Sequence, residues 1–274
     1  ANNALGTNAA GTTVASGATL DFRNVAYSTT EAVTLNGGTL AASTGTSSFA
    51  GPVTLGANSN VVVGGTQLTL SGAIGGAGFG ISKQGNGTLV LSGTNTYTGA
   101  TNINAGMLTA SGGNAIPDAS QVNLADVAGA TLSLANSETI GNLAGGGAAG
   151  GNVVLGSNTL TVNQGAATTY SGVIGGSGGL TKTGTDTLTL AGAGTYTGVT
   201  NINAGALTAA NAAALGATAG GTNVGTSARL IVDSVALGTE SITLSGPGLF
   251  GSGAITSYGA ASIAGSVTLA GNAI

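Results

Sequence analysis

The segment GGLTKTGTDTLTLAGAGTYTGVTNINAGALTA (Gly178–Ala209) has the pattern of short β-strands joined by tight corners. Apolar residues alternate with small polar ones, as in Leu188-Thr189-Leu190, and a period of two is typical of a strand. Glycine and Asn separate these runs, and glycine supplies the positive φ angles that tight corners need. The segment therefore predicts strands of about three to five residues and compact turns.

The same pattern occurs twice. Residues 172–209 repeat residues 72–110 at an offset of about 100 residues, with a gap of a single residue. Looser repetition extends outward, since GTTVASGATL (Gly11–Leu20) returns as GTNVGTSARL (Gly221–Leu230). The chain thus holds about two and a half tandem copies. We expect one continuous domain over residues 1–274, with repeat phases of roughly 1–113, 114–211 and 212–274.

Composition excludes several classes of protein. Of the 274 residues, 4% are charged, 3% are aromatic and 53 are glycine, yet 42% are hydrophobic, which argues against disorder. A net charge of −4 without a basic cluster lacks the electrostatic footprint of a nucleic-acid-binding protein. Glycine interrupts each apolar run before the roughly 18 residues of a transmembrane helix. We therefore expect neither nucleic-acid binding nor membrane insertion of this segment.

The tandem repeats and very short strands favour a parallel solenoid over an antiparallel sandwich. Stacked coils would place Val, Ile and Leu in columns inside a narrow tube, which needs no Trp. At about 20 residues per coil, the chain predicts an all-β, right-handed parallel β-helix of about 13–14 coils and near 65 Å in length. The prediction fails if Leu89 and Leu188 lie in antiparallel hairpins or face solvent.

Gly178–Ala209 closely resembles the passenger-associated transport repeat of bacterial autotransporters. That pattern runs Gly-Leu-x-Lys-x-Gly, Thr-Leu-x-Leu-x-Gly, Thr-Tyr-Thr-Gly and Thr-x-Ile-x-x-Gly-x-Leu. Gly80–Ala110 is similar, with Ile81 and Ser82 in place of Leu and Thr. The resemblance implies an extracellular passenger of a Gram-negative bacterium, linked to an outer-membrane β-barrel in the full-length chain. The residues that match the motif, and for which we expect structural roles, are Lys83, Gly85, Tyr97, Gly99, Lys182, Gly184, Tyr196 and Gly198.

His and Cys are both absent, which removes Ser-His-Asp and Cys-His catalysis and the usual transition-metal ligands. The remaining candidates are three glutamates that each precede an apolar strand: Glu31, Glu138 and Glu240. A recurring Glu suits one acid of a glycosidase pair or a Ca²⁺ ladder, but we favour a corner or edge residue that discourages aberrant strand pairing. The two motif lysines are isolated from these acids. We expect no cofactor, no metal and no enzyme activity.

The sequences Thr96-Tyr97-Thr98 and Thr195-Tyr196-Thr197 leave two interpretations open. Exposed tyrosines stack on sugars or on a partner chain, and Thr-x-Thr ladders order water on ice-binding proteins. The interpretation that we favour is a Tyr that covers a corner of the coil.

We therefore expect a non-catalytic extracellular structural segment, either a rigid stalk or an adhesin-like passenger of a secreted surface protein. The alternative is a self-assembling, fibre-forming surface or matrix protein, because solenoid ends are open sheet edges and neither terminus shows a polar cap. A β-helical carbohydrate-active enzyme and an ice-binding protein are the remaining alternatives. Expected partners are further copies of the chain, end to end or laterally, or ligands on a host surface.

Overall fold

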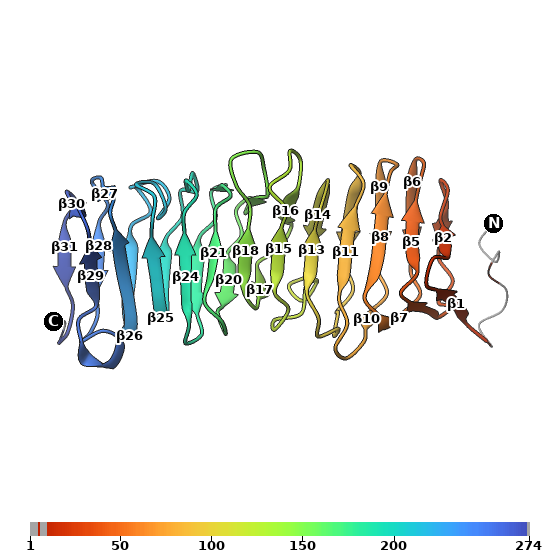
Figure 1. Cartoon of the computed structure of the whole chain (residues 1–274), viewed down its shortest axis with the longest axis horizontal. Coiled ribbons are helices and arrows are strands. Elements are labelled where there is room, and N and C mark those ends of the chain that lie inside the picture. Colours follow the sequence, from red (N-terminus) through yellow and green to blue (C-terminus); the bar gives the residue numbers. More distant parts are fainter. Residues whose placement is uncertain (1–4, 6–9, 273–274) are drawn as a thin grey trace.

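The computed structural model describes residue 5 and residues 10–272. Its strands stack side by side into a rod that follows the order of the sequence from one end to the other (Figure 1). Neighbouring strands in the rod are separated by one coil of chain, and the pairings between named strands in this part of the chain are parallel. The prediction of an all-β parallel solenoid is confirmed. Apart from one short 3-10 turn, η1 (Leu249–Gly251), the described elements are strands.

Each coil passes through three faces, which we number in chain order. Face 1 holds β1 (Thr12–Ala15), β4 (Val33–Asn36), β7 (Val53–Ala57), β10 (Ile74–Gly75), β17 (Glu138–Ile140), β20 (Leu160–Asn163), β23 (Leu180–Thr183), the first parts of β25 (Thr200–Ala209) and β26 (Thr222–Asp233), β28 (Ile242–Leu244) and β31 (Val267–Leu269). Face 2 holds β2 (Thr19–Asp21), β5 (Thr39–Ala42), β8 (Ser59–Val63), β11 (Ile81–Gln84), β13 (Thr101–Ile103), β15 (Val122–Leu124), β18 (Leu143–Gly145), β21 (Thr168–Tyr170), β24 (Thr187–Leu190), the second parts of β25 and β26, and β29 (Ile255–Tyr258). Face 3 holds β3 (Ala26–Tyr27), β6 (Thr46–Phe49), β9 (Gln67–Leu70), β12 (Thr88–Leu91), β14 (Met107–Ala110), β16 (Thr131–Leu134), β19 (Asn152–Val154), β22 (Ile174–Gly175), β27 (Ala236–Leu237) and β30 (Ser262–Ile263).

The two longest strands, β25 and β26, run past the corner between faces 1 and 2. The first part of β25 pairs with β23 on face 1 and its second part pairs with β24 on face 2. The register between β25 and β26 shifts between Ile202 and Ala204, where the chain turns the corner. A local irregularity of this kind lets a strand bend without losing its ladder on either side.

The core consists of aliphatic columns inside the tube. Leu89 is paired with Leu68 on one side and Leu108 on the other, and Leu188 is paired with Leu207. Both Leu89 and Leu188 are fully buried. The condition set for the solenoid prediction is therefore met: equivalent positions of successive coils lie above one another, and their inward-facing apolar side chains fill the tube.

The rod has about 12 turns, fewer than the 13–14 predicted. The difference arises because many coils are longer than 20 residues: Thr12 pairs with Val33 and Leu230 pairs with Ile255, steps of 21 and 25 residues. Corner loops absorb the extra residues without adding a strand. At about 4.8 Å per turn the rod is about 58 Å long.

The two copies of the transport-repeat motif lie on different faces. Lys83 belongs to β11 on face 2, whereas Lys182 belongs to β23 on face 1. In contrast, Gly11–Leu20 and the matching Gly221–Leu230 both run from face 1 to face 2. The second motif is therefore displaced by one face relative to the looser repeat around it.

Candidate functional site

The first motif lysine, Lys83, lies inside the tube. Its Cα partners in the inward-facing column are Val61 and Ile103, and its side chain is fully buried. The ammonium Nζ donates hydrogen bonds to the carbonyl oxygens of Gln84 (3.1 Å), Gly85 (2.7 Å) and Ala105 (3.0 Å). Three donors meet three acceptors, which is the full capacity of an ammonium group.

The second motif lysine repeats this arrangement one face away. Lys182 is fully buried between Val162 and Ile202 in its column. Its Nζ donates to the carbonyl oxygens of Thr183 (2.7 Å), Gly184 (3.0 Å) and Ala204 (3.0 Å). Each lysine thus ties the corner of its own coil to the corner of the next one.

Burial lowers the pKa of Lys83 to about 8, because the interior disfavours the charged form. The same desolvation lowers the pKa of Lys182 to about 8, opposed by the nearby carboxylate of Asp186. A lysine with a lowered pKa is a candidate general base. Here the three carbonyl bonds hold the amine inside the fold, away from solvent.

The motif glycines occupy positions that exclude a side chain. Gly85 and Gly184 have φ angles of 76° and 75° at the corners that the lysines bind. Gly99 and Gly198 approach the backbone of the preceding coil so closely that an added Cβ would collide with it. The spacing Lys-x-Gly therefore sets both the corner and the carbonyl that accepts from the lysine.

The motif tyrosines are buried, which contradicts the sugar-stacking interpretation of an exposed ring. Tyr97 is fully buried, and its hydroxyl shares a 2.7 Å hydrogen bond with the hydroxyl of Thr101, which in turn shares a 3.0 Å bond with Ser120. Tyr196 is also fully buried and is bonded to Thr200 at 2.6 Å. Burial raises the pKa of both phenols.

The three candidate glutamates lie inside the tube and not at an exposed edge. Glu31 is 1%, Glu138 2% and Glu240 3% exposed. Glu31 accepts hydrogen bonds from the hydroxyls of Thr12 (2.7 Å) and Tyr27 (3.2 Å). The glutamates are whole turns apart along the rod, so their carboxyl groups do not approach one another.

The other two glutamates differ from each other in their partners. Glu240 accepts a 2.8 Å bond from the hydroxyl of Thr222. Glu138 accepts a 2.6 Å bond from the backbone amide of Ile116, and its Oε2 is buried without a hydrogen-bond partner among the described residues. Burial raises the pKa of Glu138 to about 7, with a further rise from the charge of Asp118, and burial raises the pKa of Glu240 as well. Glu138 thus combines a raised pKa with a carboxyl oxygen that has no partner among the described residues.

Charged side chains elsewhere in the described part of the chain are dispersed. Arg23 and Asp21 form an exposed ion pair at 2.7 Å. Arg229 donates a hydrogen bond to the carbonyl oxygen of Leu249 in the loop after β28. Asp233 accepts one from the hydroxyl of Ser234. Among residues 5 and 10–272, no group of three His, Cys, Asp or Glu side chains lies close enough together to hold a metal ion. Within the same residues, no helix has the length and apolarity to cross a membrane.

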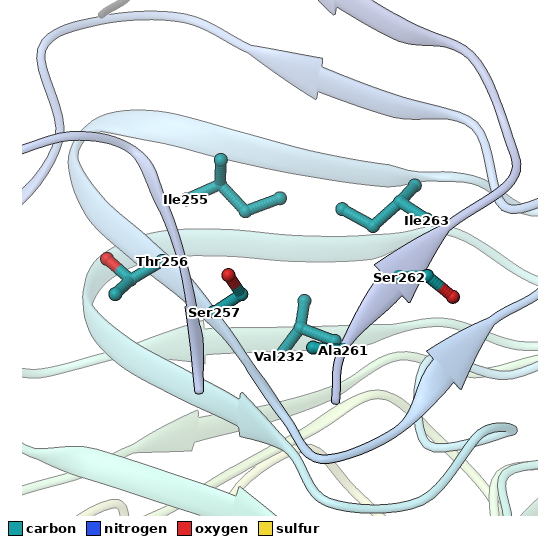
Figure 2. Close-up of a pocket in the computed structure, with 7 residues that line it drawn as sticks. All are labelled: Val232, Ile255, Thr256, Ser257, Ala261, Ser262 and Ile263. Atoms are coloured by element: carbon teal, nitrogen blue, oxygen red, sulfur yellow. The ribbon is translucent and has the colours of Figure 1, made fainter. Parts of the chain in front are cut away.

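Two cavities of the rod lack the titratable groups of a catalytic site. Figure 2 shows a cavity of about 190 Å³ near the C-terminal end of the rod, lined by aliphatic and hydroxyl side chains: Val232, Ile255, Thr256, Ser257, Ala261, Ser262 and Ile263. A second cavity, of about 250 Å³, lies on face 2 and is lined mainly by glycines and by Asn58, Ser82 and Asn102. Neither lining contains a carboxylate or an amine.

Stacking also creates outward-facing polar columns that sequence reasoning missed. On face 1 one column of paired residues runs Thr139, Thr161, Thr181, Asn201, Asn223, Thr243 and Thr268. Within it, the amide of Asn223 donates to that of Asn201 at 3.0 Å. The signal was the alternation of a polar residue with apolar ones in strands such as Leu160-Thr161-Val162, but only the register reveals which polar residues align.

Comparison with known proteins bears on these features. Residues 81–110 and 180–209 match the model of the passenger-associated-transport-repeat family. A curated relative, the adhesin BmaC autotransporter of Brucella suis biovar 1 (strain 1330), is 44% identical over 146 residues, which make up 52% of this chain and 4% of the relative. The chain thus corresponds to a small part of that relative's length. No solved structure matches the chain. With two transport repeats stacked in a parallel solenoid and a relative named as an autotransporter adhesin, the chain has the repeats and the fold of an autotransporter passenger.

Proposed function

We propose that this chain is a non-catalytic, rod-shaped segment of an adhesin-like passenger, displayed at the surface of a Gram-negative bacterium. The observation that carries the proposal is the continuous parallel stack of coils, together with two transport repeats and 44% identity to part of an autotransporter adhesin. A stack of coils is stiff along its axis because each coil is hydrogen-bonded to its neighbours. Such a rod holds adhesive surfaces away from the cell.

The placement of the titratable groups supports a non-catalytic role. The two buried lysines are bonded to backbone carbonyls, and the three buried glutamates lie on separate turns. An enzyme on a β-helix needs unrepeated charged residues from adjacent coils that converge in a cleft. The buried lysines instead join the corners of successive coils.

Surface display of residues 1–274 fused to an outer-membrane β-barrel tests this proposal. We expect the segment to reach the outside of the cell, to appear as a rod about 58 Å long in electron micrographs, and to raise attachment to host cells or matrix-coated surfaces. A control variant carries Lys83→Ala and Lys182→Ala, which remove the hydrogen bonds from both lysines to the carbonyl oxygens of the corners. Display without any gain in attachment would contradict the adhesive part, and cleavage of a glycan by the purified segment would contradict the non-catalytic part.

A second candidate is a self-assembling fibre. Backbone pairing already joins successive coils of this chain, and the same pairing between copies of the chain would extend the rod into a fibre. Sedimentation of the purified chain over a range of concentrations distinguishes the two, since growing assemblies support a fibre and a constant monomer contradicts it.

A further inference from the structure

Face 1 is interrupted in the middle of the rod. After β10 the next strand on this face is β17, although the chain passes the face twice in between, and all of the intervening residues are described. The second pass is made by residues 111–120, which connect β14 on face 3 to β15 on face 2 and form no strand. We call this segment the face-1 loop. The loop is therefore not held by the strand pairing that joins other coils.

The two neighbouring coils hold the face-1 loop largely through side chains. On one side lies Asn95, which is 4% exposed. Its backbone amide donates to the carbonyl oxygen of Asn114 (3.0 Å), and its side-chain amide donates to that of Ala115 (2.6 Å). On the other side, Oε1 of Glu138 accepts a 2.6 Å hydrogen bond from the amide of Ile116. A carboxyl group is thus the link between the loop and the following coil.

The geometry of the loop allows its middle part to open by itself. Ala115 and Ile116 are fully buried, whereas much of the rest of the loop is exposed. Before them stand Gly112 and Gly113, with φ angles of 136° and 77°, and a glycine pair permits the backbone to reorient. After them, the hydroxyl of Ser120 donates to a carbonyl oxygen of the preceding coil at 2.9 Å and fixes the end of the loop.

The carboxyl group of Glu138 is poorly suited to carry a charge. Its Oε2 atom is buried and has no hydrogen-bond partner among the described residues. Burying an ionised carboxylate with one bare oxygen costs more than burying the neutral acid. Burial accordingly raises the pKa of Glu138 to about 7, although the loop amides of Ile116 and Ala115 favour the charged form. The neutral carboxyl is the form that this site accommodates best.

The groups around this carboxyl do not compensate a negative charge. Asp118, in the loop itself, is exposed, and its charge disfavours a second negative charge nearby. Tyr97, from the coil that carries Asn95, is buried, and burial together with the charge of Glu138 raises the pKa of its phenol. On the far side β17 pairs with β20, whose residues Leu160–Asn163 carry no titratable side chain. Ionised Glu138 therefore gains most from contact with water.

The other two buried glutamates lack this combination. Glu31 accepts a hydrogen bond from the hydroxyl of Thr12 on β1, and Glu240 accepts one from the hydroxyl of Thr222 on β26. Both partners belong to strands that are paired with neighbouring coils. A charge on either glutamate thus acts on a segment that the backbone ladder already holds, whereas Glu138 binds a loop without a ladder.

We propose that Glu138 is a proton-controlled latch on the face-1 loop: the protonated carboxyl keeps residues 112–119 closed on the rod, and loss of the proton to water releases them. The released loop exposes Ala115 and Ile116, which are buried in the closed form. The rod thus presents one surface in acid and another near neutral pH. The inference concerns one corner of the fold and is independent of the proposed adhesin-like function.

Hydrogen exchange followed by mass spectrometry from pH 4 to pH 8 tests the latch in the whole chain. Rates are divided by the intrinsic rate at each pH, so that the remaining change reports opening of the structure. A pKa of about 7 in the closed loop, against the ordinary 4.5 in water, corresponds to a rise in opening on the order of 300-fold. We expect this rise in peptides that cover residues 111–120, levelling off above pH 7, and no comparable rise around Leu89 on β12.

Two glutamate variants form a matched pair. Glu138→Gln keeps the side-chain volume and an acceptor oxygen but carries no charge, so its loop should stay protected across the whole pH range. Glu240→Gln should keep the pH dependence of the parent loop. A parent loop whose protection does not change with pH overturns the proposal, as does a Glu138→Gln loop that opens with pH as the parent loop does.

A third variant protects the test if Glu138→Gln fails to fold. Asp118 is exposed, so Asp118→Asn leaves the packing intact and removes the charge that opposes ionisation of Glu138. The rise in opening should then be smaller and should level off at a lower pH. An unchanged profile in Asp118→Asn overturns the latch. Equal loss of protection in the loop and around Leu89 also overturns it, in favour of unfolding of the whole rod.

Discussion

The two copies of the transport-repeat motif have the same local structure in different places on the rod. Lys83 and Lys182 are both fully buried and both bind three carbonyl oxygens, yet they lie on faces 2 and 1. Tyr97 and Tyr196 likewise bond to a Thr four residues later. The motif therefore forms the same hydrogen bonds at a corner of its coil, whether it lies on face 1 or on face 2.

The copies differ in the residues that pack against them from later coils. Beside the second motif, Tyr196, Thr200, Thr222 and Glu240 all lie at the corner between faces 3 and 1, and Glu240 accepts from the Thr222 hydroxyl. Beside the first motif, the Tyr97 group lies at another corner, and Glu138 accepts from a backbone amide with one oxygen unpartnered among the described residues. Contacts within the motif are thus determined locally, whereas contacts between the motif and its surroundings depend on the face that it occupies.

The largest expected effect comes from removing the buried lysine that both copies of the motif share. Lys83→Ala and Lys182→Ala each leave a cavity and three unsatisfied carbonyls, and each should lower the free energy of unfolding by about 3–5 kcal/mol. Urea unfolding followed by circular dichroism measures the loss. The Lys→Met variants keep the volume and isolate the hydrogen bonds. A large loss of unfolding free energy for one lysine variant but not for the other would show that the two buried lysines are not equivalent.

The second-largest expected effect concerns Glu138, the buried glutamate beside the first copy of the motif. Because the pKa of Glu138 is raised to about 7 from an ordinary 4.5, the folded state binds its proton more tightly than the unfolded state. The free energy of unfolding should be highest below pH 4.5 and should fall by on the order of 2 kcal/mol as the pH rises to 7. The lysines act in a separate window, since lowered pKa values near 8 add stability only as pH rises above 8.

Unfolding free energies measured from pH 4 to pH 8 check this prediction, with Glu138→Gln and Glu240→Gln as paired variants. Glu138→Gln should remove most of the change in unfolding free energy with pH. Glu240→Gln should remove less, because Thr222 supports the ionised carboxylate. An identical profile for the parent chain and for Glu138→Gln would rule out this glutamate as the source.

A smaller effect tests the tyrosine hydroxyls. Tyr97→Phe and Tyr196→Phe each remove one buried hydrogen bond and keep the ring, so each should cost about 1 kcal/mol. The costs should agree between copies, because Thr101 and Thr200 each keep another partner, Ser120 and the carbonyl of Leu215. Thermal unfolding of both variants measures the difference, and a cost above about 3 kcal/mol in either would indicate a wider polar network.

The smallest effect contrasts an exposed cation with the buried ones. Arg23 is 72% exposed and pairs with Asp21 in solvent, so Arg23→Ala should cost less than about 1 kcal/mol. The same urea titration used for the lysine variants provides the comparison. A loss as large as that of Lys83→Ala would mean that exposure does not govern the worth of a cation in this fold.

Much of the fold followed from local pattern. Short alternating runs such as Leu188-Thr189-Leu190 predicted strands, and tandem repetition predicted their stacking, because only a parallel arrangement brings equivalent residues together at every turn. The surroundings of the candidate site residues were harder to predict from the sequence. A Lys within a short strand is normally a solvent-facing residue, and nothing local indicates that the ammonium of Lys83 reaches the carbonyls of Gly85 and Ala105 in two successive coils.

The glutamates and the loop at residues 246–253, between β28 and β29, show the same limit. Glu31 precedes its strand as an edge residue would, but the hydroxyls that accommodate it belong to Thr12, a coil earlier, and to Tyr27. The segment 246–253 has a glycine-rich sequence typical of any turn, and its carbonyl oxygens at Leu249 and Gly253 accept hydrogen bonds from Arg229. In both cases a decisive partner is about one coil distant.

The sequence by itself determined that this chain is all-β, repetitive, nearly uncharged and similar to a passenger, because strand period, glycine corners and motif spacing are properties of adjacent residues. The tertiary structure decided how many residues each turn contains, which face each motif occupies, and which polar groups are buried together. Those outcomes depend on register between residues some 20 positions apart. Register is set by the sum of all corner lengths, and no single stretch of the sequence contains that sum.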